Sequence, residues 1–214
     1  MKPLNQYIKE KLIVNKDYND VEIVVKSFDE LRNIIEDRYD KLGAGTEQKP
    51  IDFNDIDVSN IDSFCDNDDN GLFEKTKFKY IDISDWDTSS VTNMLSMFYK
   101  CNELKSVGDI SYWDVSNVTN MAYMFTGCSN LNQDISRWNV SLVTDMSYMF
   151  FGCENFNQNI SSWDVSKVAD MCSMFNFCSS FNQDLSKWNI SKVKNNILMF
   201  ENCPIKEEYK PKFK

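Results

Sequence analysis

The stretch DISRWNVSLVTDMSYMFFGC, residues 134–153, decides the fold of this chain, because close variants of it begin at Asp82, Asp109, Asn159 and Asp184. The chain's five tryptophans mark the repeat and lie 27, 25, 25 and 25 residues apart, at Trp86, Trp113, Trp138, Trp163 and Trp188. A fixed period of this length indicates identical units stacked on one another, in place of a single mixed core. Most of the recurring residues are therefore expected to be structural.

Each unit divides into two pieces with different patterns. The second piece carries apolar residues at helical spacing, which predicts a helical turn with Ser141 as its N-cap; these residues are Val143, Met146, Met149, Phe150 and Cys153. The first piece predicts a short strand centred on Ile135, followed by a bend that turns Trp138 into the core. One short parallel strand plus one helical turn per ~25-residue coil is typical of leucine-rich repeats. The sequence thus predicts an α/β repeat solenoid of leucine-rich-repeat-like type.

The chain is expected to have three segments. Residues 1–45 do not repeat and predict an N-terminal α/β cap, which would cover the apolar end of the stack. Residues 46–203 predict the solenoid, whose first coil, 46–80, is degenerate but keeps Asp57-Val58-Ser59 and Leu72-Phe73. Residues 204–214 contain two prolines and predict a C-terminal tail.

Local signals within the cap predict its elements. An apolar helical pattern is formed by Leu4, Ile8, Leu12 and Ile13. The β-branched run 21–25 predicts a strand. Ser27 and Glu30 form a capping box before an apolar stripe that ends at Gly43, which predicts a second helix; the stripe is Leu31, Ile34, Ile35 and Leu42.

Composition excludes several classes of function. The net charge is -10 and there is no histidine. Catalysis by Ser-His-Asp or Cys-His sets is therefore excluded, and nucleic-acid binding is disfavoured because phosphates need clustered Lys or Arg. We expect no enzyme, no metal and no cofactor. The start of the chain has no continuous apolar run that would make a signal peptide, and no stretch is long enough to span a bilayer, so we expect a cytoplasmic or phage-particle protein without membrane insertion.

The seven cysteines do not predict disulfides. Five of them share one phase of the repeat, so stacked copies would point the same way, a poor geometry for pairing; they are Cys101, Cys128, Cys153, Cys178 and Cys203. An odd count and the absence of Cys-x-x-Cys pairs also favour free, buried thiols over disulfides or zinc.

The repeat resembles that of a known family. The unit Asp-Ile-Ser-x-Trp-Asp-Val-Ser-x-Val-Thr-x-Met-x-x-Met-Phe-x-x-Cys is similar to the repeat of BspA-like surface proteins, which also occurs as a domain of unknown function in Mycoplasma-type lipoproteins. The similarity covers about residues 54–203. The lead-in 5–12, the helix that begins near Asp29 and the stretch 52–59 also resemble short proteins of gut Bacteroidetes and their phages. The resemblance implies a leucine-rich-repeat-like fold and, for secreted members, adhesion to host proteins or other cells.

Positions that vary between units are the best candidates for a binding site, because a solenoid framework is constant while exposed variable positions select the partner. One group of them lies between Phe and Cys of each unit: Tyr99, Thr126, Phe151, Asn176 and Phe177. The column between Ser and Trp holds Tyr112, Arg137, Ser162 and Lys187, and Tyr and Arg are frequent anchors at interfaces. A neighbouring column of carboxylates holds Asp109, Asp134 and Asp184. These carboxylates either bind Ca²⁺ or a basic partner, or accept N–H groups of their own turns. A further polar column, Asn132-Gln133 and its copies, is expected to bond the backbone of the next coil.

These observations predict a non-enzymatic protein–protein interaction module built on a repeat solenoid, with an adhesin-like ancestry. Its partner would be a protein that contacts an extended surface instead of entering a cleft. The alternative, from another class, is a structural or accessory component of a phage particle, in which the repeat serves as a rigid spacer.

Overall fold

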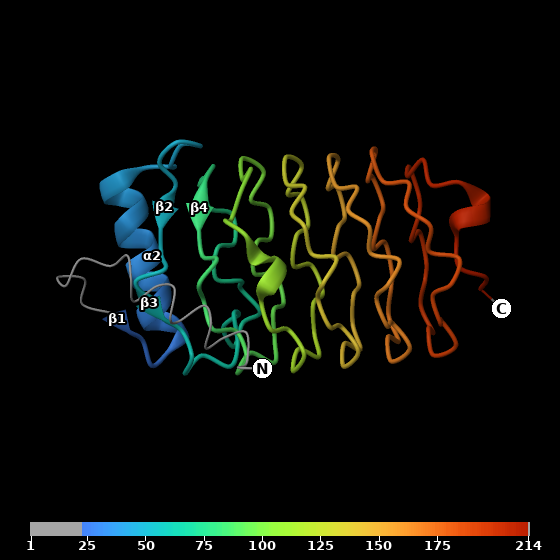
Figure 1. Ribbon diagram of the computed structural model, residues 1–214, viewed down its shortest axis with the longest axis horizontal. Coiled ribbons are helices and arrows are strands. Elements are labelled where there is room, and N and C mark those ends of the chain that lie inside the picture. The colour runs from blue at the N-terminus through green and yellow to red at the C-terminus, as the bar shows by residue number, and fades with distance from the viewer. Residues whose placement is uncertain (1–22, 214) are drawn as a thin grey trace, which may run out of the picture.

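Successive coils lie one upon another along the long axis of the molecule (Figure 1). The computed structural model describes residues 23–213. Identical side chains of adjacent coils meet: the indoles of Trp113 and Trp138 stack with centroids 6.3 Å apart, and the rings of Phe125 and Phe150 stack at 5.8 Å. The 25-residue period of the sequence is therefore the spacing of side chains that are in contact.

Regular strands are confined to the N-terminal part of the molecule. Strand β1 (Ile23–Val24) pairs in parallel with β3 (Ile56–Asp57), and β2 (Ile51–Asp52) pairs in parallel with β4 (Ile81–Asp82). The predicted strand over 21–25 is confirmed in its described part. The apolar pattern from Leu4 to Ile13 lies outside the described residues.

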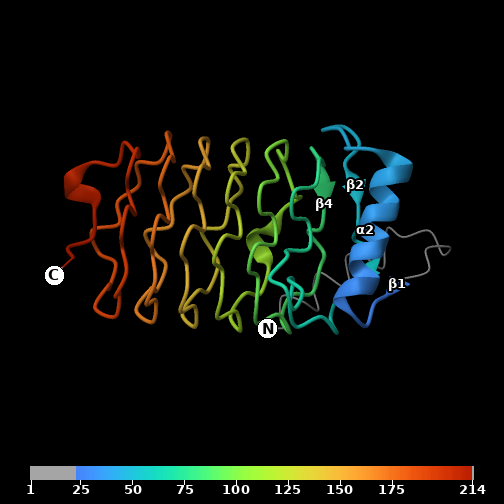
Figure 2. The ribbon, with the colours of Figure 1, turned by 180° about the vertical axis from the view of Figure 1, so that it is seen from behind.

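Helix α2 (Phe28–Leu42) lies across the N-terminal end of the coils (Figures 1 and 2). The Ser27 side chain accepts a hydrogen bond from the Glu30 backbone N–H, and Gly43 ends the helix at a φ of 78°, so both predicted ends are confirmed. The predicted apolar stripe is wrong at its last member: Leu31 and Ile35 are buried, but Leu42 is 60% exposed. Leu42 is the last residue of the helix.

Polar and aromatic contacts attach α2 to the first coil. Both guanidinium nitrogens of Arg38 donate to the carboxylate of Asp55, at 2.7 and 2.6 Å. Tyr39 packs edge-on against Phe78, with ring centroids 5.0 Å apart. The degenerate coil follows the same register, because Phe73 N–H donates to the Met97 carbonyl and its ring stacks on Phe98 at 5.3 Å. Leu72-Phe73 thus occupies the place of Met-Phe.

The predicted strand and helical turn within each unit are not what the structure contains. No strand forms at Ile135; its carbonyl instead accepts the Trp138 N–H at 3.2 Å, which makes the bend that brings both side chains inside. Parallel pairing occurs elsewhere, at single bridges through Asn93, Asn120, Asp145, Asp170 and Asn195. We call residues 146–153 and their copies in the other units the Met-Phe segment. This segment cannot be α-helical, because φ is positive at Tyr148 and Gly152 whereas helical φ is negative.

Backbone bonds from the Met-Phe segment of one coil to that of the next all run in one direction. From Met146 onward, alternate N–H groups donate to alternate carbonyls of the following coil at 2.8 to 3.0 Å: Met146 to Asp170, Tyr148 to Cys172, Phe150 to Met174 and Gly152 to Asn176. Equivalent sets of four bonds, whose first donors are Met94, Met121 and Met171, join the other complete coils. In these coils such N–H groups therefore point toward the C-terminal end and the accepting carbonyls toward the N-terminal end.

Side chains join the coils where backbone groups do not. Each Trp indole N–H donates to a carbonyl of the coil before it, as Trp138 does to Ile110 at 2.9 Å. The Asn132 amide oxygen accepts the Asn157 N–H, and Gln158 donates to the Asn132 carbonyl, both at 3.0 Å. The prediction that the Asn-Gln column bonds the next coil is confirmed by these contacts.

Two short 3-10 helices complete the elements. Helix η1 (Ile110–Tyr112) is capped by the Asp109 carboxylate and lies in the longer unit, and η2 (Glu207–Tyr209) lies in the tail. The tail folds back over the last coil, where the Tyr209 carbonyl accepts the Leu185 N–H at 2.8 Å and Ile205 is buried.

One glycine is required by the close approach of two coils. A Cβ on Gly71 would lie 1.8 Å from the Ser96 carbonyl oxygen, which is backbone and cannot rotate away. We expect Gly71→Ala to lower the free energy of unfolding by more than about 2 kcal/mol, as measured by urea denaturation. Gly43→Ala is the control: no atom lies within 4 Å of its Cβ, so only the cost of positive φ, about 1 kcal/mol, applies. Equal losses for the two variants would contradict the steric explanation.

Candidate functional site

The predicted column between Ser and Trp is exposed along the stack. We call Tyr112, Arg137, Ser162 and Lys187 the charged strip, and all four side chains face solvent. The Arg137 guanidinium lies 5.0 Å from the centroid of the Tyr112 ring, so these two residues form a cation–π pair across adjacent coils. Ser162 donates to the Ser136 carbonyl at 3.4 Å. The structure thus brings Tyr and Arg of the strip into contact.

The neighbouring carboxylates are bound within their own turns. Asp134 accepts the Ser136 N–H at 3.0 Å, Asp184 accepts the Ser186 N–H at 2.9 Å, and Asp109 accepts both the N–H and the hydroxyl of Ser111. Hydrogen bonds from Ser136 lower the pKa of Asp134, and Arg137 lowers it further; bonds from Ser186 lower the pKa of Asp184. Within residues 23–213, no cluster of three or more potential metal ligands is present. In the structure these three carboxylates accept the N–H groups of their own turns.

A second surface joins three of the variable positions between Phe and Cys to two tyrosines that the sequence analysis did not single out. Five aromatic side chains from four successive coils contact one another in a row, which we call the aromatic ladder: Tyr99, Tyr123, Tyr148, Phe151 and Phe177. At its centre the rings of Tyr123 and Tyr148 are parallel, with centroids 4.7 Å apart. The ladder is partly open to solvent, since Phe177 is 50% exposed and the other four are half-buried. Lys100 lies over the Tyr99 ring at 4.9 Å and adds a cation at one end.

The backbone at the ladder's two central residues is unusual for tyrosine. Tyr123 and Tyr148 have φ of 58° and 56°, a conformation that costs a side-chain-bearing residue about 1–2 kcal/mol. Glycine would avoid this cost, and the corresponding position of two other coils holds the smaller residue Ser96 or Ser173. Burial raises the pKa of Tyr123 and contact with the Cys172 thiol raises that of Tyr148, so both hydroxyls remain protonated donors. Positive φ belongs to this position of the repeat, since Leu198 shares it as well, and two of the coils place a phenol ring there.

One family model matches the chain, and it matches most of it. The model is described as "Mycoplasma protein of unknown function, DUF285", and its two overlapping matches span residues 67–157 and 135–208. The chain belongs to the DUF285 family. No curated protein and no protein of solved structure matches it. The DUF285 matches cover every complete repeat unit, together with the charged strip and the aromatic ladder.

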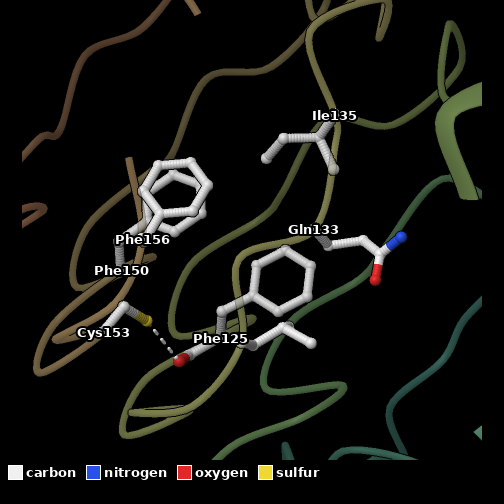
Figure 3. A pocket seen from close by; sticks show the side chains of 7 residues that line it. Phe125, Gln133, Ile135, Phe150, Cys153 and Phe156 are labelled. Carbon is white, nitrogen blue, oxygen red and sulfur yellow. Dashed lines mark hydrogen bonds between the residues drawn. The ribbon is translucent and has the colours of Figure 1, made fainter. Parts of the chain in front are cut away.

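The interior of the DUF285 units is filled by side chains. Figure 3 shows one gap between two of them, a cavity of about 10 Å³ beside Phe125, Phe150 and Cys153. A single water needs roughly this much space, so no organic ligand fits in this cavity. Among the described residues, no helix combines the length and apolar character needed to cross a membrane.

The in-phase cysteines of this DUF285 chain are free thiols with a structural role. All seven cysteines are unpaired, as predicted, and Cys153 donates to the Phe125 carbonyl of the preceding coil at 2.9 Å (Figure 3). Cys101, Cys128 and Cys178 bond the corresponding Phe carbonyls in the same way. Burial raises the pKa of Cys128, Cys153 and Cys178. The thiols therefore act as small apolar residues that satisfy one carbonyl per coil.

These raised pKa values predict a loss of stability in alkali. In the unfolded chain a thiol ionises near pH 8.5, whereas the buried thiols stay protonated, so above that pH the unfolded state releases protons and is favoured. We expect the free energy of unfolding to be constant with respect to these groups below about pH 8 and to fall above it, by up to about 1.4 kcal/mol per pH unit for each thiol. Urea titrations from pH 7 to 9.5 measure this slope. Cys153→Ala should reduce the slope, and an unchanged slope would refute its assignment to the thiols.

Proposed function

We propose that this protein is a non-enzymatic protein–protein interaction module that binds its partner on the outside of the coil stack. The observation that carries this proposal is the aromatic ladder. Tyrosine rings provide large contact area at little cost in conformational entropy, and they are enriched at binding hot spots. The lack of histidine and the filled interior support a binding role over a catalytic one.

The charged strip is the second contact surface of this proposed module. Its Tyr112–Arg137 pair supplies an aromatic face and a guanidinium, and Lys187 lies further along the same column. The Asp109, Asp134 and Asp184 carboxylates stand beside it and remain exposed on one side of their turns. Exposed charges of this kind affect association rate and specificity more than affinity. We therefore propose that the aromatic ladder anchors a partner and that the strip selects it.

The wider classification belongs to the same proposal. We propose that the coil stack is a leucine-rich-repeat-like solenoid in which single parallel bridges and turns replace the strand and helix of each repeat. We also propose that it shares ancestry with BspA-like surface proteins, whose repeat carries the same Trp, Met-x-x-Met-Phe and Cys columns. Adhesive binding to another protein follows from that ancestry.

A peptide selection tests the proposed function without knowledge of the natural partner. Peptides are selected from a random 12-residue display library on the wild-type protein, and each clone is then measured on two variants. Tyr123→Ser with Tyr148→Ser removes two rings of the ladder; serine is chosen because Ser96 and Ser173 hold the same position at the same sign of φ. Arg137→Glu with Lys187→Glu reverses the charges of the strip.

We expect both variants to fold, because the altered side chains lie on the outside. Most selected clones should lose at least about thirtyfold in affinity for the serine variant, the effect of about 2 kcal/mol at a hot spot. Clones that contact the strip should associate more slowly with the glutamate variant. Selection of peptides that bind both variants as tightly as wild type would show that neither surface is the site, and would overturn the proposal.

A further inference from the structure

The last coil carries a row of backbone donors that nothing in the described structure accepts. In the preceding coils the corresponding N–H groups each donate to the next coil, as Met171, Ser173, Phe175 and Phe177 do to carbonyls of the last coil at 2.8 to 3.0 Å. No acceptor within residues 23–213 meets the equivalent groups of the last coil, which are Asn196, Leu198, Phe200 and Asn202. We call the backbone 196–202 the C-terminal edge. It is a template for one more strand-like segment.

Apolar side chains flank this edge and are more exposed than the side chains at the same positions of the inner coils. Ile197 is 65% exposed, whereas Ala122 at the same position of an inner coil is 3% exposed. Leu198 is 54% exposed, whereas the equivalent Ser173 is 2% exposed. In inner coils the next coil covers these positions. The C-terminal edge therefore presents apolar area that a bound segment would cover in the same way.

The C-terminal tail closes the core but leaves the edge open. The tail pairs with Leu185 through the Tyr209 carbonyl, and its Lys210 lies over the outer face of the Phe200 ring at 5.8 Å. Between the tail and the last coil a hollow of about 470 Å³ remains, lined at its ends by Lys194, Asn196, Lys212 and Phe213. The hollow adjoins the start of the edge at Asn196. A segment bound on the edge has room to continue into it.

Charge at this end is opposite to that of the rest of the chain. Residues 187–214 contain seven Lys and three Glu, which gives them a net charge of +4. Because the whole chain has a net charge of -10, residues 1–186 have a net charge of -14. Lys192, Lys194 and Lys212 lie at or near the hollow, and no salt bridge joins them to another described residue. The acidic residue within the edge is Glu201, at its far end, and Glu207 is bonded to Lys210. The positive charge is thus concentrated where the edge begins.

We propose that the C-terminal edge binds an extended, acidic segment of a partner protein as one further layer of the stack. Alternate backbone carbonyls of the segment accept the four free N–H groups, and its apolar side chains cover Ile197 and Leu198. The segment runs parallel to the last coil, as coils do, so its first residues lie over Lys194 and Lys212. It is therefore acidic at its beginning and apolar afterwards. This site lies at the end of the stack and begins where the aromatic ladder ends, since Phe177 N–H donates to the Glu201 carbonyl at 3.0 Å.

The chain supplies its own probe for this site. Residues 169–178, which begin Ala-Asp, accept such a row of N–H groups from the coil before them. A fluorescein-labelled peptide of this sequence, with both cysteines replaced by serine and two glutamates added in front, is titrated against the full chain. A peptide with the same residues in scrambled order is the control. Fluorescence anisotropy gives the affinity, and amide hydrogen exchange reports on the four N–H groups themselves.

We expect the probe to bind more tightly than the scrambled peptide and to slow exchange at Leu198, Phe200 and Asn202. Lys194→Glu with Lys212→Glu should weaken binding about tenfold, and Ile197→Ser with Leu198→Ser should weaken it at least as much. Binding without slower exchange at these amides would overturn the proposal, as would equal binding of the scrambled peptide. Slower exchange that depends on protein concentration, without peptide, would assign the edge to a second copy of the chain and would also overturn it.

Discussion

Replacing Trp138 by alanine should lower the free energy of unfolding by about 3–5 kcal/mol, one of the largest effects of any single substitution in this chain. The indole is 3% exposed and stacks on Trp113, and its ring packs 6.3 Å from Phe125. Its N–H also donates to the Ile110 carbonyl at 2.9 Å. The alanine variant loses the packing of a large side chain and leaves that buried carbonyl without this donor. Urea denaturation followed by tryptophan fluorescence and circular dichroism measures the loss.

The matched control for this substitution is Trp138→Phe. Phenylalanine retains most of the stacked ring but cannot donate to Ile110, so its cost should be about 1–3 kcal/mol. The difference between the two variants separates stacking from the hydrogen bond. Tyr112→Ala, on the surface of the neighbouring coil, should cost less than about 1 kcal/mol. If Trp138→Ala were no more damaging than Tyr112→Ala, the indole could not belong to the core of a stack.

Removing one complete unit should leave a folded protein, whereas removing half a unit should not. Deletion of residues 139–163 takes out 25 residues and joins Trp138 to Asp164, which restores the sequence Trp-Asp-Val-Ser at the junction. Each coil contacts only its neighbours, so the shortened stack keeps every type of interface. We expect cooperative unfolding with a lower midpoint and a denaturant slope reduced by about a tenth, in proportion to the area lost.

The half-unit deletion is the matched counterpart. Removal of residues 139–150 takes out most of the Met-Phe segment of one coil and places Trp138 directly before Phe151. Trp163 then follows Trp138 after 13 residues in place of 25, so the units on the two sides of the deletion cannot stack in register, and the row of hydrogen bonds between coils is interrupted there. We expect a chain without cooperative unfolding, as shown by circular dichroism and a flat urea profile. Cooperative unfolding of this variant at the wild-type midpoint would contradict stacking in register.

Much of the local structure could be predicted from the sequence because each signal has a single physical cause. Ser27 and Gly43 predict the ends of α2 through capping and positive φ, and both are confirmed. The in-phase cysteines predict free thiols, since residues in one column point the same way. The Asn-Gln column predicts bonds to the next coil, because an amide side chain can satisfy both kinds of backbone group.

The conformation of the Met-Phe segment could not be predicted from spacing. Apolar residues at i, i+3, i+4 and i+7, such as Val143 to Phe150, are typical of a helix face. The same spacing arises here from short turns in which positive φ at Tyr148 and Gly152 returns the chain to the core side. In the sequence, Gly127 and Gly152 are recognisable signs of positive φ, whereas tyrosine at Tyr123 and Tyr148 gives no such sign. The spacing therefore places Tyr123 and Tyr148 in a helical turn. It does not show that they join Tyr99, Phe151 and Phe177 on one surface, although both tyrosines follow the first Met of their unit by two residues.

The hydrogen bonds between the Met-Phe segments of successive coils align peptide dipoles along the long axis of the stack. In the Met-Phe segments the alternate N–H groups point toward the C-terminal end, so their peptide dipoles add from coil to coil as they do along an α-helix. The seven lysines of the last 28 residues extend this asymmetry in side-chain charge. The two ends of the stack are thus opposite poles, and a charged partner that approaches would be turned before it makes contact.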